Sequence, residues 1–384
     1  MPRLQNPPLS LYVHLPWCVQ KCPYCDFNSH PLRATLPEQD YLAALLSDLA
    51  EELARVPGRT IETVFFGGGT PSLFSAAAIG RVLEAVGAQL AADAEITLEA
   101  NPGTVEHGAF SAYRAAGINR LSLGAQTFDA AALKRLGRIH GPDEIERAVD
   151  EARAAGLDNF NLDLMYALPA QSLDLALADI ERALALGPAH LSHYQLTLEP
   201  QTPFAKHPPP LPDDDAIWTM QLECQAALAA AGFVQYETSA YARSGRQCRH
   251  NRNYWQYGDY LGVGAGAHGK LTEAASGRIV RREKVRHPTR YMRAAGSPAV
   301  FSEKRVADND RMFEFMLNAL RLNEGFDQRL VETRTGLPLG VADPALTQAM
   351  GLGLLVRDGE RYAPSERGRA YLNDLQALFL PEAA

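Results

Sequence analysis

Residues 12–25, YVHLPWCVQKCPYC, place three cysteines directly after a short strand-like run. The cysteines are Cys18, Cys22 and Cys25, and their spacing is C-x3-C-x2-C. Three thiolates this close together can bind three irons of a [4Fe–4S] cluster. Because the cluster takes four ligands, the fourth iron keeps an open site for a small chelating molecule. The spacing therefore predicts an iron–sulfur cluster at the carboxyl end of the first strand.

Two alternatives remain open from the spacing alone. A zinc site could be closed by His30 or His14, because zinc takes four nitrogen or sulfur ligands. Cys22 and Cys25 could also form a redox pair. The opening residues carry no secretory signal, and no uncharged apolar run approaches the roughly 20 residues of a membrane helix. We therefore expect a cytoplasmic protein, whose reducing surroundings disfavour structural disulfides.

Length and charge limit the possible functions. The chain has 384 residues, a net charge of −8 and 46% hydrophobic residues, which is enough for two or three globular domains. Charged residues make up 21%, a value that indicates neither disorder nor a fibrous repeat. Because nucleic-acid binding needs a positive face, the acidic balance argues against it, although a small basic patch stays compatible with the composition.

Outward from the cysteines, short strand-like runs alternate with helical patterns, which is typical of a parallel sheet with helical crossovers. The expected strands are Leu9–Leu15, Ile61–Phe66, Glu95–Ala100, Asn119–Ala125, Asn159–Tyr166 and His190–Leu198. The expected helices are Glu38–Val56, Ser75–Ala92, Thr104–Ala116, Asp143–Ala155, Ser172–Leu186 and Asp213–Ala231. We predict an α/β fold, a partial (β/α)6 barrel, with a doubly wound open sheet as the alternative.

Polar residues alternate with apolar residues along these strands. Glu99, Gln126 and Asp163 lie on the polar face, at or near the carboxyl ends of three successive strands, and His193 is expected on the polar face of a later one. Closed eight-stranded barrels pack aliphatic side chains inside, whereas this pattern predicts a wide polar lumen that holds a ligand. Barrel active sites assemble at the carboxyl ends of the strands, so these residues are site candidates.

Residues 12–25 resemble the radical S-adenosylmethionine (SAM) signature C-x3-C-x-aromatic-C. The resemblance extends to Phe66–Pro71, which reads FGGGTP, and to His250–Trp255, which reads HNRNYW. These motifs are similar to the radical SAM family that contains the oxygen-independent coproporphyrinogen III dehydrogenases and the heme chaperones. Phe27 stands where the dehydrogenases carry a fourth cysteine, so the resemblance to the chaperones is closer.

This resemblance implies a [4Fe–4S] cluster held by three cysteines plus exchangeable SAM. A glycine run lets the backbone approach a ligand closely, which suits Gly68, Gly69 and Thr70 to the methionine part of SAM. Carried over from the family, the expected SAM contacts are Tyr12, Gly68, Gly69, Thr70, Glu99, Gln126, Arg138 and Asp163. Residues 262–267 imitate a dinucleotide fingerprint without a following helix, and the resemblance places them at the far side of the SAM site, near His268.

A cluster of aromatic residues follows Cys248 and supplies the heme candidates. An aromatic cluster with one histidine is ordinarily core packing, but the family motif begins at His250 and implies heme as cargo. His250 is the candidate axial ligand, with Tyr254 and Trp255 lining the site, and Cys248 is the weaker ligand candidate. The basic residues of 281–286 could meet heme propionates or anionic lipid, with a solvated face as the simpler interpretation.

The expected organisation has three parts. Residues 1–270 form the radical SAM partial barrel, residues 271–304 form a connector or short hairpin with a basic face, and residues 305–384 form a small, mostly helical C-terminal domain. In that last part three helices precede a hairpin at Asp358-Gly359 and a final helix at Ser365–Phe379, an order that resembles a winged helix. Because this region is acidic, we expect it to act as a docking module or a lid and not as a DNA-binding domain.

The leading functional hypothesis is a heme chaperone that carries heme to heme proteins, including membrane respiratory enzymes. Such a protein needs a heme or iron donor and client proteins, and it could touch a membrane surface transiently. The alternative is an enzyme, a SAM-dependent coproporphyrinogen III dehydrogenase. A radical SAM RNA-modifying enzyme is disfavoured by the acidic charge. The sequence leaves open the client, the oligomeric state, SAM cleavage and the role of the basic segment 278–293.

Overall fold

The computed structural model describes residues 4–103 and 109–381. In this part of the chain, a single sheet of twelve strands dominates the fold, and its middle strands run in the sequence order expected of a partial barrel. From edge to edge, the strands are β14 (Phe301–Arg305), β13 (Arg278–Lys284), β12 (His268–Glu273), β11 (Asp259–Val263), β1 (Leu9–Leu15), β4 (Ile61–Gly68), β5 (Leu90–Ala100), β6 (Arg120–Gln126), β7 (Phe160–Tyr166), β8 (His190–Gln195), β10 (Ala240–Ala242) and β9 (Val234–Glu237).

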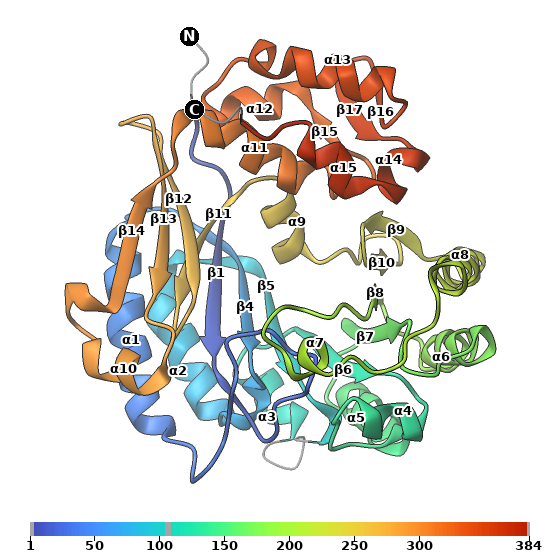
Figure 1. The fold of residues 1–384 in the computed structure, drawn as a ribbon. Coiled ribbons are helices and arrows are strands. Elements are labelled where there is room, and N and C mark those ends of the chain that lie inside the picture. The colour runs from blue at the N-terminus through green and yellow to red at the C-terminus, as the bar shows by residue number, and fades with distance from the viewer. Residues whose placement is uncertain (1–3, 104–108, 382–384) are drawn as a thin grey trace.

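Helices cover the outer face of this sheet, as Figure 1 shows for α1, α2, α5, α6 and α8. Their bounds are α1 (Glu38–Ala54), α2 (Ala76–Val86), α3 (Phe110–Ala115), α4 (Ala130–Arg135), α5 (Pro142–Ala154), α6 (Leu173–Ala185), α7 (Pro203–Lys206), α8 (Asp214–Ala230), α9 (Arg249–Trp255) and α10 (Pro288–Ala294). Between helices and sheet lies a continuous apolar core, built from residues such as Leu11, Val64, Leu98, Leu121 and Leu162.

The parallel register confirms the α/β prediction. The strands β11, β1, β4, β5, β6, β7 and β8 pair in parallel, and each of the six expected strands is present. The sheet is larger than six units, because β11 joins β1 and antiparallel strands extend both ends. In the described residues β14 and β9 are the free edges, so the partial barrel stays open.

One of the expected helices ends earlier than predicted, and the predicted start of another lies outside the described residues. The helix expected over Ser75–Ala92 ends at Val86, because Gly87 takes a positive φ of 57°, and β5 then begins at Leu90. For the helix expected over Thr104–Ala116, residues 104–108 lie outside the described part of the chain, and α3 covers Phe110–Ala115.

The prediction that His193 lies in the lumen is wrong. The β7–β8 register pairs His193 with Leu164, on the helix-facing side, where its ring lies 4.7 Å from that of Tyr166, centroid to centroid. The lumen side of β8 instead carries Ser192, which pairs with Asp163. The prediction counted the alternation through residue 198, but β8 ends at Gln195 and the period of two stops there.

The interior of the sheet is polar, as predicted. A cavity of about 230 Å³ deep in the lumen is lined mostly by polar side chains, namely Tyr12, Phe65, Glu99, Arg120, Ser122, Asn161, Asp163, His190, Ser192, His250, Asn251 and Tyr254. Helix α9 contributes His250 and Tyr254 to this cavity, and so covers one side of the lumen. A polar lumen leaves room for ligands where a closed barrel would pack aliphatic side chains.

The C-terminal region lies above one end of the sheet in Figure 1. It contains α11 (Asp308–Ala319), β15 (Phe326–Asp327), α12 (Gln328–Thr335), α13 (Asp343–Gly351), β16 (Leu355–Asp358), β17 (Arg361–Pro364), α14 (Glu366–Ala370) and α15 (Leu372–Ala377). Its own core includes Phe315, Phe326 and Tyr362. The predicted hairpin is present as β16–β17, but the predicted last helix is split at Tyr371.

The segment expected to be a connector, residues 271–304, holds two strands that extend the main sheet, with α10 between them. The C-terminal region contacts this extension through Glu314, whose carboxylate accepts hydrogen bonds from Arg281 and Tyr257 at 2.7 Å each. The division into residues 1–270, 271–304 and 305–384 stays a prediction, and residues 1–3 and 382–384 lie outside the described part. No helix among the described residues combines the length and apolar character needed to cross a membrane.

Candidate functional site

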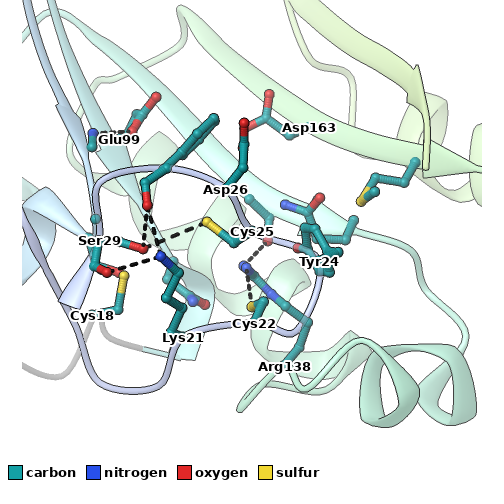
Figure 2. A pocket seen from close by; sticks show the side chains of 18 of the residues that line it. Cys18, Lys21, Cys22, Tyr24, Cys25, Asp26, Ser29, Glu99, Arg138 and Asp163 are labelled. Atoms are coloured by element: carbon teal, nitrogen blue, oxygen red, sulfur yellow. Dashed lines mark hydrogen bonds between the residues drawn. The ribbon is translucent and has the colours of Figure 1, made fainter. Parts of the chain in front are cut away.

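The three cysteines lie on one loop at the carboxyl end of β1. Two short strands, β2 (Trp17–Cys18) and β3 (His30–Pro31), pair in parallel and bring the two ends of this loop together. Inside the loop, Lys21 Nζ donates hydrogen bonds to the backbone oxygens of Phe27, at 2.8 Å, and Ser29, at 3.1 Å. The loop is therefore held in shape by its own contacts, and Figure 2 shows its three cysteine side chains with Arg138 beside Cys22.

The cysteines line a cavity of about 290 Å³ at the carboxyl ends of the parallel strands. Seven of the eight expected SAM contacts line the same cavity: Gly68, Gly69, Thr70, Glu99, Gln126, Arg138 and Asp163. Tyr12 does not line it, because it lies deeper in β1, where its ring stacks 6.3 Å from that of Phe65. The structure therefore brings seven of the expected SAM contacts to one cavity and places Tyr12 in the walls of the two cavities that adjoin it at Glu99.

The glycine run after β4 lies directly against the cysteine loop. The amide of Gly69 donates to Leu15 O at 2.8 Å, and the amide of Thr70 donates to Trp17 O at 2.7 Å. A Cβ on Gly69 would lie only 2.4 Å from Trp17 O, and Gly68 has a φ of 115°, which other residues rarely adopt. These positions require glycine because β4 and the cysteine loop approach each other so closely.

Charges of both signs face the cavity. Burial and the neighbouring carboxylate of Asp163 raise the pKa of Glu99 to about 8, and Glu99 Oε2 accepts a hydrogen bond from Gly68 N at 3.2 Å. Burial also raises the pKa of Asp163 above its ordinary value, although Asn161 and Ser122 donate hydrogen bonds to its carboxylate. A bound cation would favour the charged form of both carboxyl groups.

Arg138 supplies the opposite charge. Its Nη2 donates to Gly124 O at 2.7 Å, and its Nη1 lies 3.7 Å from Cys22 Sγ. Arg138 itself lines the cavity, so its guanidinium places a positive charge there. The cavity therefore suits a ligand that carries a carboxylate near Arg138 and a positive group near the two carboxyl side chains.

The geometry gives no support to the zinc alternative. Among the described residues, no three His, Cys, Asp or Glu side chains converge closely enough to hold one metal ion. Of the two histidines expected to close a zinc site, His14 has partners at both ring nitrogens, Tyr12 OH at 3.1 Å and Asn28 O at 3.0 Å. His30 Nε2 has no hydrogen-bond partner in the described residues, but His30 belongs to no group of three possible ligands there. The three cysteines instead spread around a cavity, an arrangement that suits a cluster larger than a single ion.

The heme candidates lie on α9 or, for Cys248, directly before it, and both ring nitrogens of His250 already lie within hydrogen-bond distance of a hydroxyl oxygen. His250 is buried, its Nδ1 lies 2.8 Å from Thr63 Oγ1, and its Nε2 lies 3.0 Å from Tyr254 OH. Burial also lowers the pKa of His250 to about 3. Cys248 is buried as well, with Sγ 3.6 Å from Glu95 Oε1. Tyr254 and Trp255 do line a cavity, of about 440 Å³.

Several residues of the cysteine cavity were not predicted. Tyr194 OH donates to Gln126 Oε1 at 2.8 Å and so orients that side chain, whose backbone has a positive φ of 69°. Ser122 Oγ, on the neighbouring strand β6, donates a hydrogen bond to Asp163 Oδ2 at 3.3 Å. Alternation counted from the start of β8 would have placed Tyr194 in the lumen. The hydrogen bond from Asn28 Nδ2 to Ala265 O, at 2.9 Å, joins the cysteine loop to residues 264–267 and carries no local sequence signal.

An open barrel with a three-cysteine loop at the carboxyl ends of its strands defines a radical SAM protein. The pattern of the Radical SAM superfamily matches residues 12–183, and that of the HemN C-terminal domain matches residues 306–371. Membership of this superfamily implies a [4Fe–4S] cluster and SAM. Coproporphyrinogen III oxidase (HemN) from Escherichia coli has the same fold, with a TM-score of 0.81 and 24% identity over 98% of this chain and 91% of that one.

Curated relatives narrow the family further. The heme chaperone HemW of Escherichia coli is 51% identical over 98% of this chain and 99% of its own, and that of Haemophilus influenzae is 48% identical over the full length of both. The mouse mitochondrial radical S-adenosyl methionine domain-containing protein 1 is 37% identical over 97% of this chain and 87% of its own. The chain belongs to the HemW family.

Proposed function

We propose that the chain is a heme chaperone, which binds heme and delivers it to heme proteins such as respiratory-chain proteins. The observation that carries this proposal is the identity of 51% and 48%, over essentially whole chains, with two relatives named heme chaperone HemW. The five cysteines are free thiols, which fits a reducing compartment, so we place the protein in the cytoplasm. Its partners would be a heme donor and client heme proteins, including membrane-bound enzymes.

Cys18, Cys22 and Cys25 would hold three irons of a [4Fe–4S] cluster, and SAM would take the fourth. When bound, this cluster supplies electrons to SAM. The chain's own residues prepare that site, because Arg138 Nη1 lies 3.7 Å from Cys22 Sγ and places a positive charge beside the cysteine loop. The ordered loop and the glycine run then set the position of the cluster relative to the rest of the cavity.

The residues expected to contact SAM would bind different parts of it according to their charge. Arg138, which lines the cavity, would bind the carboxylate of SAM. Glu99 and Asp163 would face the ammonium group and the ribose hydroxyls, and the raised pKa of Glu99 would fall when that cation binds. Backbone groups of Gly68–Thr70, with Gln126, would complete the site. Tyr12 borders the neighbouring cavities and would contact SAM only at its edge.

The experiment is heme transfer. The anaerobically reconstituted chain is loaded with hemin, separated from free hemin, and mixed with a heme-free cytochrome, whose own absorption bands report transfer. We expect hemin to move to the cytochrome faster from the chain than from hemin-loaded albumin. A chain that binds no hemin, or never passes it on, would contradict the proposal. In parallel, conversion of coproporphyrinogen III to vinyl products, with SAM and a reductant, would favour the dehydrogenase alternative.

A further inference from the structure

A second cavity, of about 440 Å³, lies beside the cysteine cavity and shares Phe27, Gly68 and Glu99 with it. Its volume falls within the roughly 300–1,000 Å³ that is common for ligand sites. Asn318 of α11 also lines it, so the C-terminal region helps to form its wall. The aromatic lining consists of Tyr12, Phe27, Tyr254, Trp255, Tyr257 and Tyr260. An aromatic wall of this kind suits a flat, largely apolar ligand.

Among the histidines that line this cavity or the deep lumen cavity, one has a ring without hydrogen-bond partners. Both ring nitrogens of His14, His190 and His250 lie 2.7–3.1 Å from polar atoms. His268, at the start of β12, has its nearest described carboxylate oxygen, on Glu283, 3.8 Å from Nε2, and its side chain is 63% exposed. A neutral imidazole that keeps a free nitrogen can ligate heme iron.

The three cationic side chains that line this cavity differ in whether they already have a carboxylate partner. Lys270 is bound to Asp259 at 3.1 Å, and Arg281 is bound to Glu314 at 2.7 Å, so both are already neutralised. Arg286 lines the cavity, is exposed, and has no carboxylate partner within the described ranges. It is therefore the cation that can bind an incoming carboxylate without first breaking an ion pair.

We propose that this second cavity is the cargo site, and that it binds a metalloporphyrin with the macrocycle against the wall formed by Tyr254 and Trp255. His268, rather than the buried His250, ligates the iron, and Arg286 holds a propionate carboxylate. This inference rests on the proposed heme-chaperone function and deepens it. Because the cavity borders Gly68 and Glu99, the cargo lies next to the SAM site without sharing the cysteines.

The test is a titration of the full chain with ferric heme, followed through the Soret band. His268→Ala should move the Soret maximum and raise Kd at least about tenfold, which is the loss of about 1.4 kcal/mol of binding free energy. Added imidazole should restore the wild-type maximum in this variant, because it fills the ligand position. Arg286→Gln should weaken binding several-fold, on the order of a charge-assisted hydrogen bond, and leave the Soret maximum unchanged.

Two matched variants control for surface effects. His287→Ala and Arg290→Gln each remove an exposed residue of the same type that does not line the cavity, and both should bind heme as the wild type does. If His268→Ala keeps the wild-type maximum and Kd, the inference is overturned while the chaperone proposal stands. The same holds if His250→Ala alone loses the band. A wild-type chain that binds no heme overturns the proposed function together with this inference.

Discussion

Gly69→Ala should disrupt the junction between the cysteine loop and β4. The added Cβ would lie 2.4 Å from Trp17 O and 2.8 Å from Trp17 N and C, whereas ordinary contacts begin near 3.4 Å. The overlap of about 1 Å falls on backbone atoms, so the loop itself must move. Overpacking typically costs about 1–3 kcal/mol, and the two hydrogen bonds that Gly69 and Thr70 donate to the loop add about 1 kcal/mol each if they break.

We therefore expect Gly69→Ala to lower the free energy of unfolding by about 3–5 kcal/mol, which corresponds to a fall of several degrees in Tm. The assay is thermal unfolding of the cluster-free chain under anaerobic conditions, followed by measurement of iron bound after reconstitution. Gly80→Ala is the matched control, since a Cβ there has its nearest atom at 3.7 Å, and a helical glycine replaced by alanine gains up to about 1 kcal/mol. A Gly69→Ala chain with wild-type Tm and full iron would refute this reasoning.

Three further predictions follow from the site. Cys22→Ala should abolish the brown cluster absorption after anaerobic reconstitution, and retained absorption would exclude Cys22 as a ligand. Asn28→Ala removes the hydrogen bonds from the cysteine loop to Ala265 O and Arg286 O, so a chelator should extract iron from this variant faster than from the wild type. Equal extraction rates would show that these two hydrogen bonds do not help to retain the cluster. The pKa of Glu99 is about 8 in the folded chain, compared with an ordinary value of 4.5. The contribution of Glu99 to the free energy of unfolding is therefore fully present below about pH 4.5 and is lost as the pH rises toward 8. The urea midpoint of the wild type should therefore fall relative to that of Glu99→Gln between about pH 4.5 and pH 8 and run parallel to it above that range, and curves that are parallel throughout would count against the raised pKa.

Much of the site was predictable because it depends on a regular geometry. The carboxyl ends of parallel strands meet at one edge of a sheet, so Glu99, Gln126 and Asp163 could be brought together from strand positions alone. The first strand was also placed correctly, because the strand-like run Leu9–Leu15 coincides with β1. In both cases a local pattern in the sequence carries the spatial information.

Other features depend on contacts between segments that are distant in the sequence. The hydrogen-bond partner of His250 Nδ1 is Thr63, which lies 187 residues away in the sequence, and no local sequence pattern indicates this hydrogen bond. His193 was misplaced because the alternation was extended past the end of β8 at Gln195. The motif that begins at His250 therefore indicated the family and two residues that line a cavity, Tyr254 and Trp255, whereas the hydrogen bonds of the His250 ring came only from the structure.

The central claim is that three neighbouring cysteines hold an iron–sulfur cluster with one open iron. Analysis of iron, acid-labile sulfide and zinc in the anaerobically purified and reconstituted chain tests it most directly. The account predicts about four iron and four sulfide per chain, lost together when any one of Cys18, Cys22 and Cys25 is replaced. One zinc per chain, with neither iron nor labile sulfide, would contradict it.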